Sequence, residues 1–292
     1  MLKKNPLAEV FGHPTDDQSA DAKRCRTRRL CPFNNKVPNC TKAKAKDPLG
    51  VCSIYENGSV AITCPVRFRQ GWRILEDAAD FFFPKGTKWT SLMEVRLKDK
   101  NGQSAGNIDL VLVAYDDKER ITDFGALEVQ AVYISGNVRE PFAKYMEDPS
   151  KPFDWPEGSD YPRPDYLSSS RKRLLPQLLY KGGILHTWGK KQAVALQSGF
   201  FATLPPLPEV APKEAEIAWL LYDLRRAKAR DGFMIAMNRI AYTGFHPALN
   251  KITTAEAGPE KEFRDYLQHK LDEQLEDRNP PDAPTLTDLE LT

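Results

Sequence analysis

The sequence NIDLVLVAY (107–115), followed by DDKER (116–120) and then by FGALEVQAVYI (124–134), decides the fold of this 292-residue chain. Both apolar stretches are rich in β-branched and aromatic residues, which favour strands. The charged stretch between them is polar throughout and does not suit a core. The sequence therefore predicts a β-hairpin near the middle of the chain.

Three polar side chains interrupt these apolar strands. If the hairpin turns between Lys118 and Glu119, Asp109 stands directly opposite Glu128, and opposed residues have Cβ atoms roughly 5 Å apart. Gln130 follows Glu128 by two residues and points to the same face. Two carboxylates at that separation can share a hard cation such as Mg2+. The pattern indicates a metal site in a nuclease, and the alternative is that both acids pair with Lys, Arg or water.

All five cysteines lie within residues 25–64, a segment interrupted by several prolines and glycines. Such a segment has few regular apolar positions and would gain order from a metal held by thiolates. Sulfur ligation suits zinc and iron equally. The expected ligands are Cys31, Cys40, Cys52 and Cys64, and Cys25 is expected to bind no metal. One alternative is that Cys25 is a ligand and one of the other four is free. Another is that the segment is a loose basic region whose thiols bind no metal.

The net charge of +2 conceals a strong asymmetry. Residues 1–70 carry 13 Lys and Arg against 6 Asp and Glu, whereas residues 256–292 carry 4 against 11. A basic amino-terminal region attracts phosphate, although a basic run also serves as a solvated face. The chain lacks a signal-peptide pattern and any run near the ~20 apolar residues of a membrane span. We therefore expect a cytoplasmic protein without membrane contact.

Apolar spacing and breaker residues predict the other elements of an α/β fold. A helix is expected at 70–83, a helix end or strand at 89–97, an irregular loop at 147–166, a helix from about 168 with a kink or true start near Pro176, a strand at 190–204, and buried strands or short helices at 219–222 and 233–237. A carboxy-terminal amphipathic helix is expected to dock on the body or on a second subunit, and the last dozen residues are expected to be frayed. The apolar face of this carboxy-terminal helix holds Phe263, Tyr266, Leu267, Leu271 and Leu275.

Several blocks of sequence occur here in a specific order: CPF (31–33), CTK (40–42), GVCS (50–53) and CPVRF (64–68), then Asp109 and EVQ (128–130). Together they resemble the NotI family of type II restriction endonucleases, within the PD-(D/E)xK nuclease class. The resemblance is good over residues 5–140 and looser beyond. It implies a mixed central sheet flanked by helices, with an amino-terminal four-cysteine metal-bound subdomain. The expected divisions are a basic metal-stapled region (1–68), a nuclease core with DNA-contacting insertions (69–255), and an amphipathic helix with an acidic tail (256–292).

The resemblance also implies an activity and its residues. The enzyme would be a homodimer that cuts a GC-rich palindrome in double-stranded DNA with Mg2+, beside a structural four-cysteine iron site. Asp109 and Glu128 would bind the Mg2+, Glu94 would be an additional acid that binds metal directly or through water, and Gln130 would stand where the class usually has lysine. Ile108 departs from the class's proline before the aspartate. An amide does not titrate at neutral pH, so we expect Gln130 to orient the attacking water.

Two basic clusters are candidates for contact with DNA. A helix that opens with hydroxyls and basic residues suits phosphate, although it can also be a solvated face. Arg and Lys in addition pair with O6 and N7 of guanine in the major groove. The candidates are Arg24, Arg26, Arg28, Arg29, Arg171, Lys172 and Arg173.

Other functions and partners follow from the same features. By analogy, a prokaryotic methyltransferase that acts on the same DNA site is an expected partner. A second class of function is a non-catalytic, metal-stapled DNA-binding protein in which the hairpin acids are scaffold. A third is a hydrolase that uses two carboxylates on a glycosidic bond, against which the basic amino-terminal region argues.

Overall fold

The computed structural model describes residues 3–34, 38–43, 46–151, 154–155, 160–226 and 232–276. The chain separates into a body, residues 1–253, and a carboxy-terminal unit, residues 254–292. All of the candidate site residues named above belong to the body.

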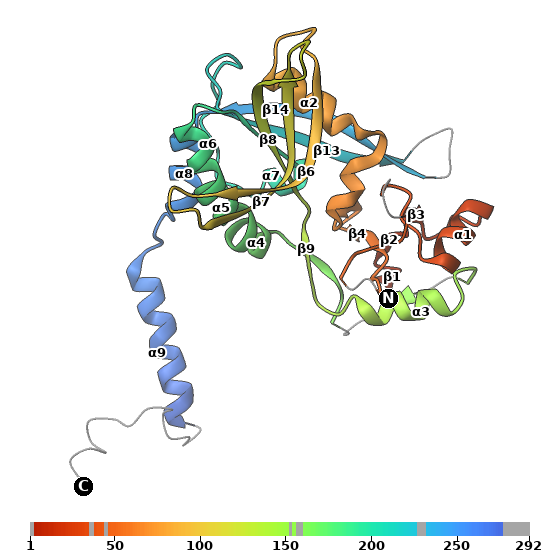
Figure 1. Cartoon of the computed structure of the whole chain (residues 1–292). Coiled ribbons are helices and arrows are strands. Elements are labelled where there is room, and N and C mark those ends of the chain that lie inside the picture. The colour runs from red at the N-terminus through yellow and green to blue at the C-terminus, as the bar shows by residue number, and fades with distance from the viewer. Residues whose placement is uncertain are drawn as a thin grey trace. The chain divides into compact units, whose positions relative to one another are not determined.

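A six-stranded mixed sheet forms the centre of the body (Figure 1), in the order β14-β13-β12-β8-β7-β6. Strand β12 runs parallel to both of its neighbours, and the other adjacent pairs are antiparallel. The sheet confirms the predicted fold class, and the predicted hairpin is β7 and β8. The strands are β6 (Trp89–Lys98), β7 (Ser104–Tyr115), β8 (Ile121–Gln130), β12 (Gln192–Gln197), β13 (Ile217–Arg226) and β14 (Phe233–Thr243).

Helix α2 (Arg73–Phe82) packs on one face of this sheet and confirms the helix predicted there. It follows η1 (Pro65–Trp72), a 3-10 segment broken at Gly71, whose φ is 64°. Gly125 of β8 permits the close approach, because a Cβ at this position would lie 2.5 Å from the ring of Phe82.

A continuous helical run and helix α8 (Phe245–Thr253) cover the opposite face. The run consists of α4 (Tyr166–Ser169), η2 (Ser170–Leu174), α5 (Leu175–Gln177), η3 (Leu178–Gly182) and α6 (Gly183–Thr187), and both η segments are π-helical turns. Proline cannot donate its backbone nitrogen to an α-helical ladder, and π-turns commonly interrupt such ladders. Pro176 therefore lies inside the predicted helix, between two wide turns, rather than at its start.

The observed strands can be compared with three further predictions, for residues 89–97, 190–204 and 147–166. Residues 89–97 form strand β6. The strand predicted over 190–204 ends at Gln197, where the short helix α7 (Ser198–Phe201) begins. The predicted irregular loop contains a short strand, β11 (Arg163–Asp165), which pairs with β9 (Tyr133–Ser135).

The amino-terminal region folds around a smaller sheet of order β3-β2-β4-β5. Its strands are β2 (Leu7–Val10), β3 (His13–Pro14), β4 (Val51–Glu56) and β5 (Ser59–Ile62). Helices α1 (Ala20–Arg28) and α3 (Arg139–Glu147) pack beside it, and β1 (Lys3–Lys4) pairs with β10 (Asp154–Trp155). Gln197 links this region to the central sheet, because its side chain accepts from Ile62 N at 2.7 Å.

The carboxy-terminal unit contains helix α9 (Glu260–Glu276), where a helix was predicted. The last dozen residues, predicted to be frayed, lie outside the described part of the chain. No helix in the described ranges is long and apolar enough to span a membrane.

Candidate active site

Three acids occupy matching positions in the register of three neighbouring strands of the central sheet. Leu110 of β7 pairs with Leu127 of β8 and with Met93 of β6. One step further along β7, Asp109 therefore faces Glu128 on one side and Glu94 on the other. This is the register that the hairpin predicts for the first pair.

Glu94 has a backbone conformation that is rare for its residue type. Its φ is 56° in the middle of a β-strand, between two residues that keep the ladder to β7. Left-handed backbone costs a non-glycine residue free energy, and such strained residues cluster at functional sites. Its side chain is exposed, and among the described residues it makes no ion pair. The Glu94 carboxylate is therefore free to bind a ligand at the edge of the row formed by Glu94, Asp109 and Glu128, called the acid row below.

Asp109 and Glu128 are neighbouring carboxyl groups at the end of the β7–β8 ladder. One oxygen of Asp109 accepts from Val129 N at 2.9 Å. Glu128 is 1% exposed, and neither of its oxygens accepts a well-formed hydrogen bond from the described residues. Burial, and next the Asp109 carboxylate, raise the pKa of Glu128 to about 8, against the opposite effect of Lys181. A buried carboxyl whose hydrogen bonding is incomplete is rare in folded proteins, and its oxygens are suited to a cation.

Lys181 is the cation beside this pair, and the motifs in the sequence did not reveal it. Its Nζ lies 2.7 Å from Glu128 Oε1 and donates to Asn107 O at 2.8 Å. It comes from η3, some fifty residues after Glu128 along the chain. The signal in the sequence was a single lysine within the apolar-rich stretch LLPQLLYKGGIL (174–185).

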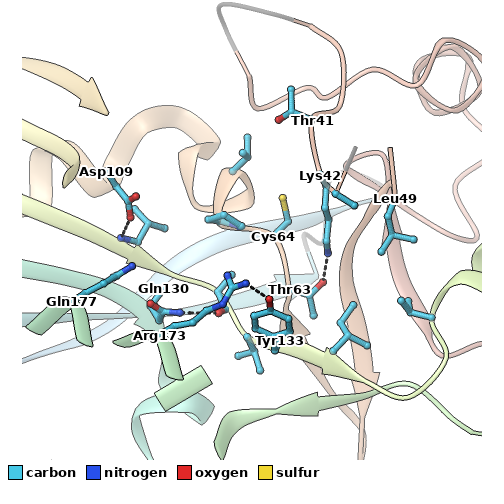
Figure 2. Close-up of a pocket in the computed structure, with 18 residues that line it drawn as sticks. Thr41, Lys42, Leu49, Thr63, Cys64, Asp109, Gln130, Tyr133, Arg173 and Gln177 are labelled. Atoms are coloured by element: carbon cyan, nitrogen blue, oxygen red, sulfur yellow. Dashed lines mark hydrogen bonds between the residues drawn. The ribbon is translucent and has the colours of Figure 1, made fainter. Parts of the chain in front are cut away.

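A cleft of about 530 Å3 extends from Asp109 and Gln130 to the cysteine region (Figure 2). The Gln130 amide donates to Ala131 O at 3.3 Å, and the residue is 5% exposed. Further along, the Arg173 guanidinium stacks 3.8 Å from the centre of the Tyr133 ring and also donates to its hydroxyl. Lys42, at the far end, donates to Thr63 Oγ1 at 3.0 Å. The cleft therefore has one acid, Asp109, at one end and two cations, Arg173 and Lys42, further along. The sequence motifs predicted neither Tyr133 nor Lys42 as part of it.

Cys64 raises the pKa of three other cysteine thiols, those of Cys31, Cys40 and Cys52. Burial raises the pKa of the Cys31 thiol to about 11, and Cys64 and Cys40 add to this effect. The pKa values of Cys40 and Cys52 are raised for the same reasons, burial first and Cys64 next among the thiols. Burial also raises the pKa of Cys25, but its charged neighbours lie on its own helix and include no cysteine. Within the described residues no three Cys, His, Asp or Glu side chains are arranged as a metal-binding group, so the four-cysteine metal site remains a prediction.

The predicted DNA-contacting residues divide by exposure. Arg26 is 3% exposed and donates to Pro14 O at 2.8 Å, so it belongs to the packing of the amino-terminal region and its predicted contact with DNA is wrong. Arg24 pairs with Asp21, and Arg29 pairs with Asp47. The candidates with exposed side chains are Arg24, Arg28, Arg29, Arg171, Lys172 and Arg173, the last of which lines the cleft.

A family model described as restriction endonuclease NotI matches residues 10–235. The chain belongs to the NotI restriction endonuclease family. The match spans the cysteines, the acid row and the cations of the helical run, and it ends within β14. No curated protein matches the chain. The family consists of type II restriction endonucleases, so the chain is a site-specific deoxyribonuclease.

Proposed function

We propose that the chain hydrolyses phosphodiester bonds at one GC-rich palindromic sequence of double-stranded DNA, with Mg2+ bound by Asp109 and Glu128. The observation that carries this proposal is the acid pair at the end of the β7–β8 ladder, beside a cleft that also holds the Arg173 and Lys42 side chains. Two neighbouring carboxylates that can hold a cation, beside a guanidinium, suit a phosphate backbone better than a neutral polymer.

The side chains fit the metal that the family implies. Both oxygens of Glu128 are buried without a well-formed hydrogen bond, and Asp109 commits one oxygen to Val129 N. Mg2+ takes one or two carboxylates and keeps several waters for substrate phosphates. Glu94 lies at the same level of the sheet, where it can accept a hydrogen bond from such a water. When bound, the cation would lower the pKa of a water and offset charge that develops on the phosphate.

The other residues of the cleft position the reactants. Gln130 neither gains nor loses a proton at neutral pH, so its amide would orient the attacking water by hydrogen bonds. The water oxygen bonds to phosphorus while one phosphorus–oxygen ester bond breaks, and the leaving oxygen takes up a proton. Arg173 would contact a phosphate near the cleft through the guanidinium nitrogens that do not donate to Tyr133.

Assembly follows from the symmetry of a palindrome. A two-fold symmetric site is matched by two copies of one chain, each with its own acid pair. We therefore infer a homodimer that acts in a prokaryotic cytoplasm with a methyltransferase of the same specificity. The exposed basic residues of α1 and of η2 are the proposed DNA contacts.

The nuclease proposal is tested by incubating the chain and Mg2+ with plasmid and phage DNA and sequencing the ends of any fragments. Asp109→Asn and Glu128→Gln should each lower the cleavage rate by about a thousandfold, since the metal contributes several kcal/mol to the transition state. Binding to the same DNA should persist in both variants. Binding without discrete fragments from the unaltered chain would instead favour a non-catalytic DNA-binding protein.

We further propose that Cys31, Cys40, Cys52 and Cys64 hold a structural iron or zinc ion. The support is the mutual influence of these thiols, which Cys25 does not share. Cys40→Ser should lower the content of iron or zinc in the purified protein and its melting temperature, whereas Cys25→Ser is the matched control and should keep its metal. Equal metal content in both variants would show that the ligands are misassigned.

A further inference from the structure

Lys181 ties together the two strands that carry the acid pair. Its Nζ contacts Glu128 of β8 at 2.7 Å and the carbonyl of Asn107 of β7 at 2.8 Å. The Lys181 side chain is 5% exposed and that of Glu128 is 1% exposed. Lysine is almost never buried to this degree without a partner, so the ammonium is held by these two contacts.

These two contacts of Lys181 lie where the backbone ladder between β7 and β8 ends. The paired residues of β7 and β8 begin at Leu110 and Leu127, so Asp109 and Glu128 stand just beyond the last rung. Gly106 of β7 has a φ of 106°, and the Lys181 side chain lies 3.9 Å from where a Cβ on Gly106 would be. Besides Lys181, the bond from Val129 N to Asp109 crosses this gap. Side chains therefore replace the backbone in setting the distance between the two acids.

The helical run holds Lys181 in a fixed place. Lys181 lies in the π-turn η3, and π-turns are frequent at functional sites. The next residue, Gly182, is seated so tightly that a Cβ there would lie 2.8 Å from Gln192 Oε1 and 2.9 Å from the ring of Phe245. This seat against β12 and α8 leaves the backbone of η3 little freedom to shift.

We infer that Lys181 is a positioning residue of the active site. Its ammonium keeps the carboxylate of Glu128 at a fixed distance from Asp109, so that both acids meet one divalent cation. Removal of Lys181 alone also leaves Glu128 buried without its partner, which lowers stability, so the melting temperature of each variant is measured beside its activity. Gln130, the neutral neighbour of the pair, supplies no charge for this purpose. The inference rests on the proposed function of Asp109 and Glu128 and adds a residue from another element.

The test compares Lys181→Met, Lys181→Arg and, as a matched control, Lys191→Met. Lys191 is also a partly buried lysine that donates to a backbone carbonyl, Phe81 O at 2.9 Å, and it makes no contact with the acids. Binding of Mn2+ is measured by calorimetry without DNA, and cleavage is measured in single turnover with Mg2+. Melting temperature and affinity for DNA are measured alongside.

Lys181→Met should weaken Mn2+ binding by roughly tenfold and slow single-turnover cleavage by roughly a hundredfold, the range found for residues that orient metal ligands. Affinity for DNA should stay within about threefold, because the ammonium is buried. Lys181→Arg should recover part of the cleavage rate, since it keeps the charge in another shape. Lys191→Met should match the unaltered chain in every measurement.

Two outcomes would overturn the inference. Normal Mn2+ binding and normal cleavage by Lys181→Met would mean that Lys181 only packs. Tighter Mn2+ binding would mean that the ammonium merely competes with the cation. If Lys181→Met does not fold, Lys181→Gln decides, because it removes the charge and keeps a polar side chain: a folded Lys181→Gln that cleaves at the normal rate would refute the role.

The same assay separates this inference from the proposed function. If the unaltered chain does not cut DNA, or if Asp109→Asn still cuts, the proposed function fails. If both behave as expected and Lys181→Met cuts normally, only the role of Lys181 fails.

Discussion

The described part of the chain buries two glutamates beside a cation, and it surrounds them differently. In the amino-terminal region, both oxygens of Glu9 accept from Arg67 Nε, at 3.1 and 3.0 Å, and one also accepts from Ser53 Oγ at 2.8 Å. In the central sheet, Glu128 has the Lys181 ammonium nearby but no well-formed hydrogen bond on either oxygen.

The difference separates a carboxylate with a full set of hydrogen bonds from one whose hydrogen bonding is incomplete. Arg67 is satisfied as well, because it donates to Gln70 Oε1 and to Phe233 O, both at 2.9 Å, and so joins the amino-terminal region to β14. Buried polar groups of folded proteins are normally paired, and an exception needs a reason. Under the proposed function, the reason for Glu128 is the divalent cation that it would bind together with Asp109.

The largest effect on stability is expected from Arg67→Met. The substitution leaves Glu9 as a buried carboxylate without its partner, which should lower the free energy of unfolding by about 3–5 kcal/mol. The additional change Glu9→Gln should recover part of this loss, because it removes the stranded charge. Denaturant unfolding measures both variants.

The matched control for this prediction is Arg69→Met. Arg69 belongs to the same 3-10 segment, is partly exposed and lies over the ring of Trp72, so its loss should change stability by less than about 1 kcal/mol. If Glu128→Gln destabilises the chain as strongly as Arg67→Met does, Glu128 is a structural residue like Glu9 and the contrast between the two glutamates is wrong.

A smaller effect is expected on the dependence of stability on pH. The pKa of Glu128 is raised from its ordinary 4.5 to about 8, so between these values the folded state binds a proton that the unfolded state has lost. Stability should therefore fall as pH rises through this window, by up to about 1.4 kcal/mol per pH unit. Glu128→Gln should lack this component of the slope.

The measurement is denaturant unfolding from pH 5 to 8 in the presence of a chelator. Saturating Ca2+ should flatten the slope of the unaltered chain, because the cation takes the place of the proton on Glu128. Identical slopes for the unaltered chain and Glu128→Gln would mean that Glu128 is ionised and satisfied, as a purely structural acid would be.

The sequence was sufficient for the part of the site that depends on local pattern. Two apolar runs and a charged turn fix the register of β7 and β8, and register places Asp109 opposite Glu128. The side chains of strands alternate with a period of two, so these positions follow from counting residues.

The sequence was not sufficient for what depends on tertiary packing. Lys181 reaches Glu128 because a later helical run crosses this face of the sheet, and no local pattern encodes that crossing. Arg26 resembles the other arginines of its helix in sequence, yet the face of α1 on which it lies packs against β3 and Tyr145. The left-handed backbone of Glu94 is likewise set by its neighbours, because its own propensity opposes it.

The smallest effect is expected from Arg173, an exposed cation in the cleft that Asp109 also lines. If its guanidinium contacts one phosphate, Arg173→Ala should weaken DNA binding by about tenfold or less and lower the slope of log affinity against log salt by about 1. The loss should be equal for cognate and unrelated DNA, since a phosphate carries no sequence information. Binding measured over a series of salt concentrations gives both quantities.

Lys118→Ala is the matched control, because Lys118 is an exposed cation of the β7–β8 turn that does not line the cleft. Lys181→Met gives a further comparison, because the ammonium of Lys181 is buried. The loss of this ammonium should alter cleavage and leave the slope of log affinity against log salt unchanged. A loss of affinity in Arg173→Ala that is confined to the cognate sequence would contradict a phosphate contact and assign Arg173 to a guanine edge, where one bidentate pair accounts for about 1–3 kcal/mol of discrimination.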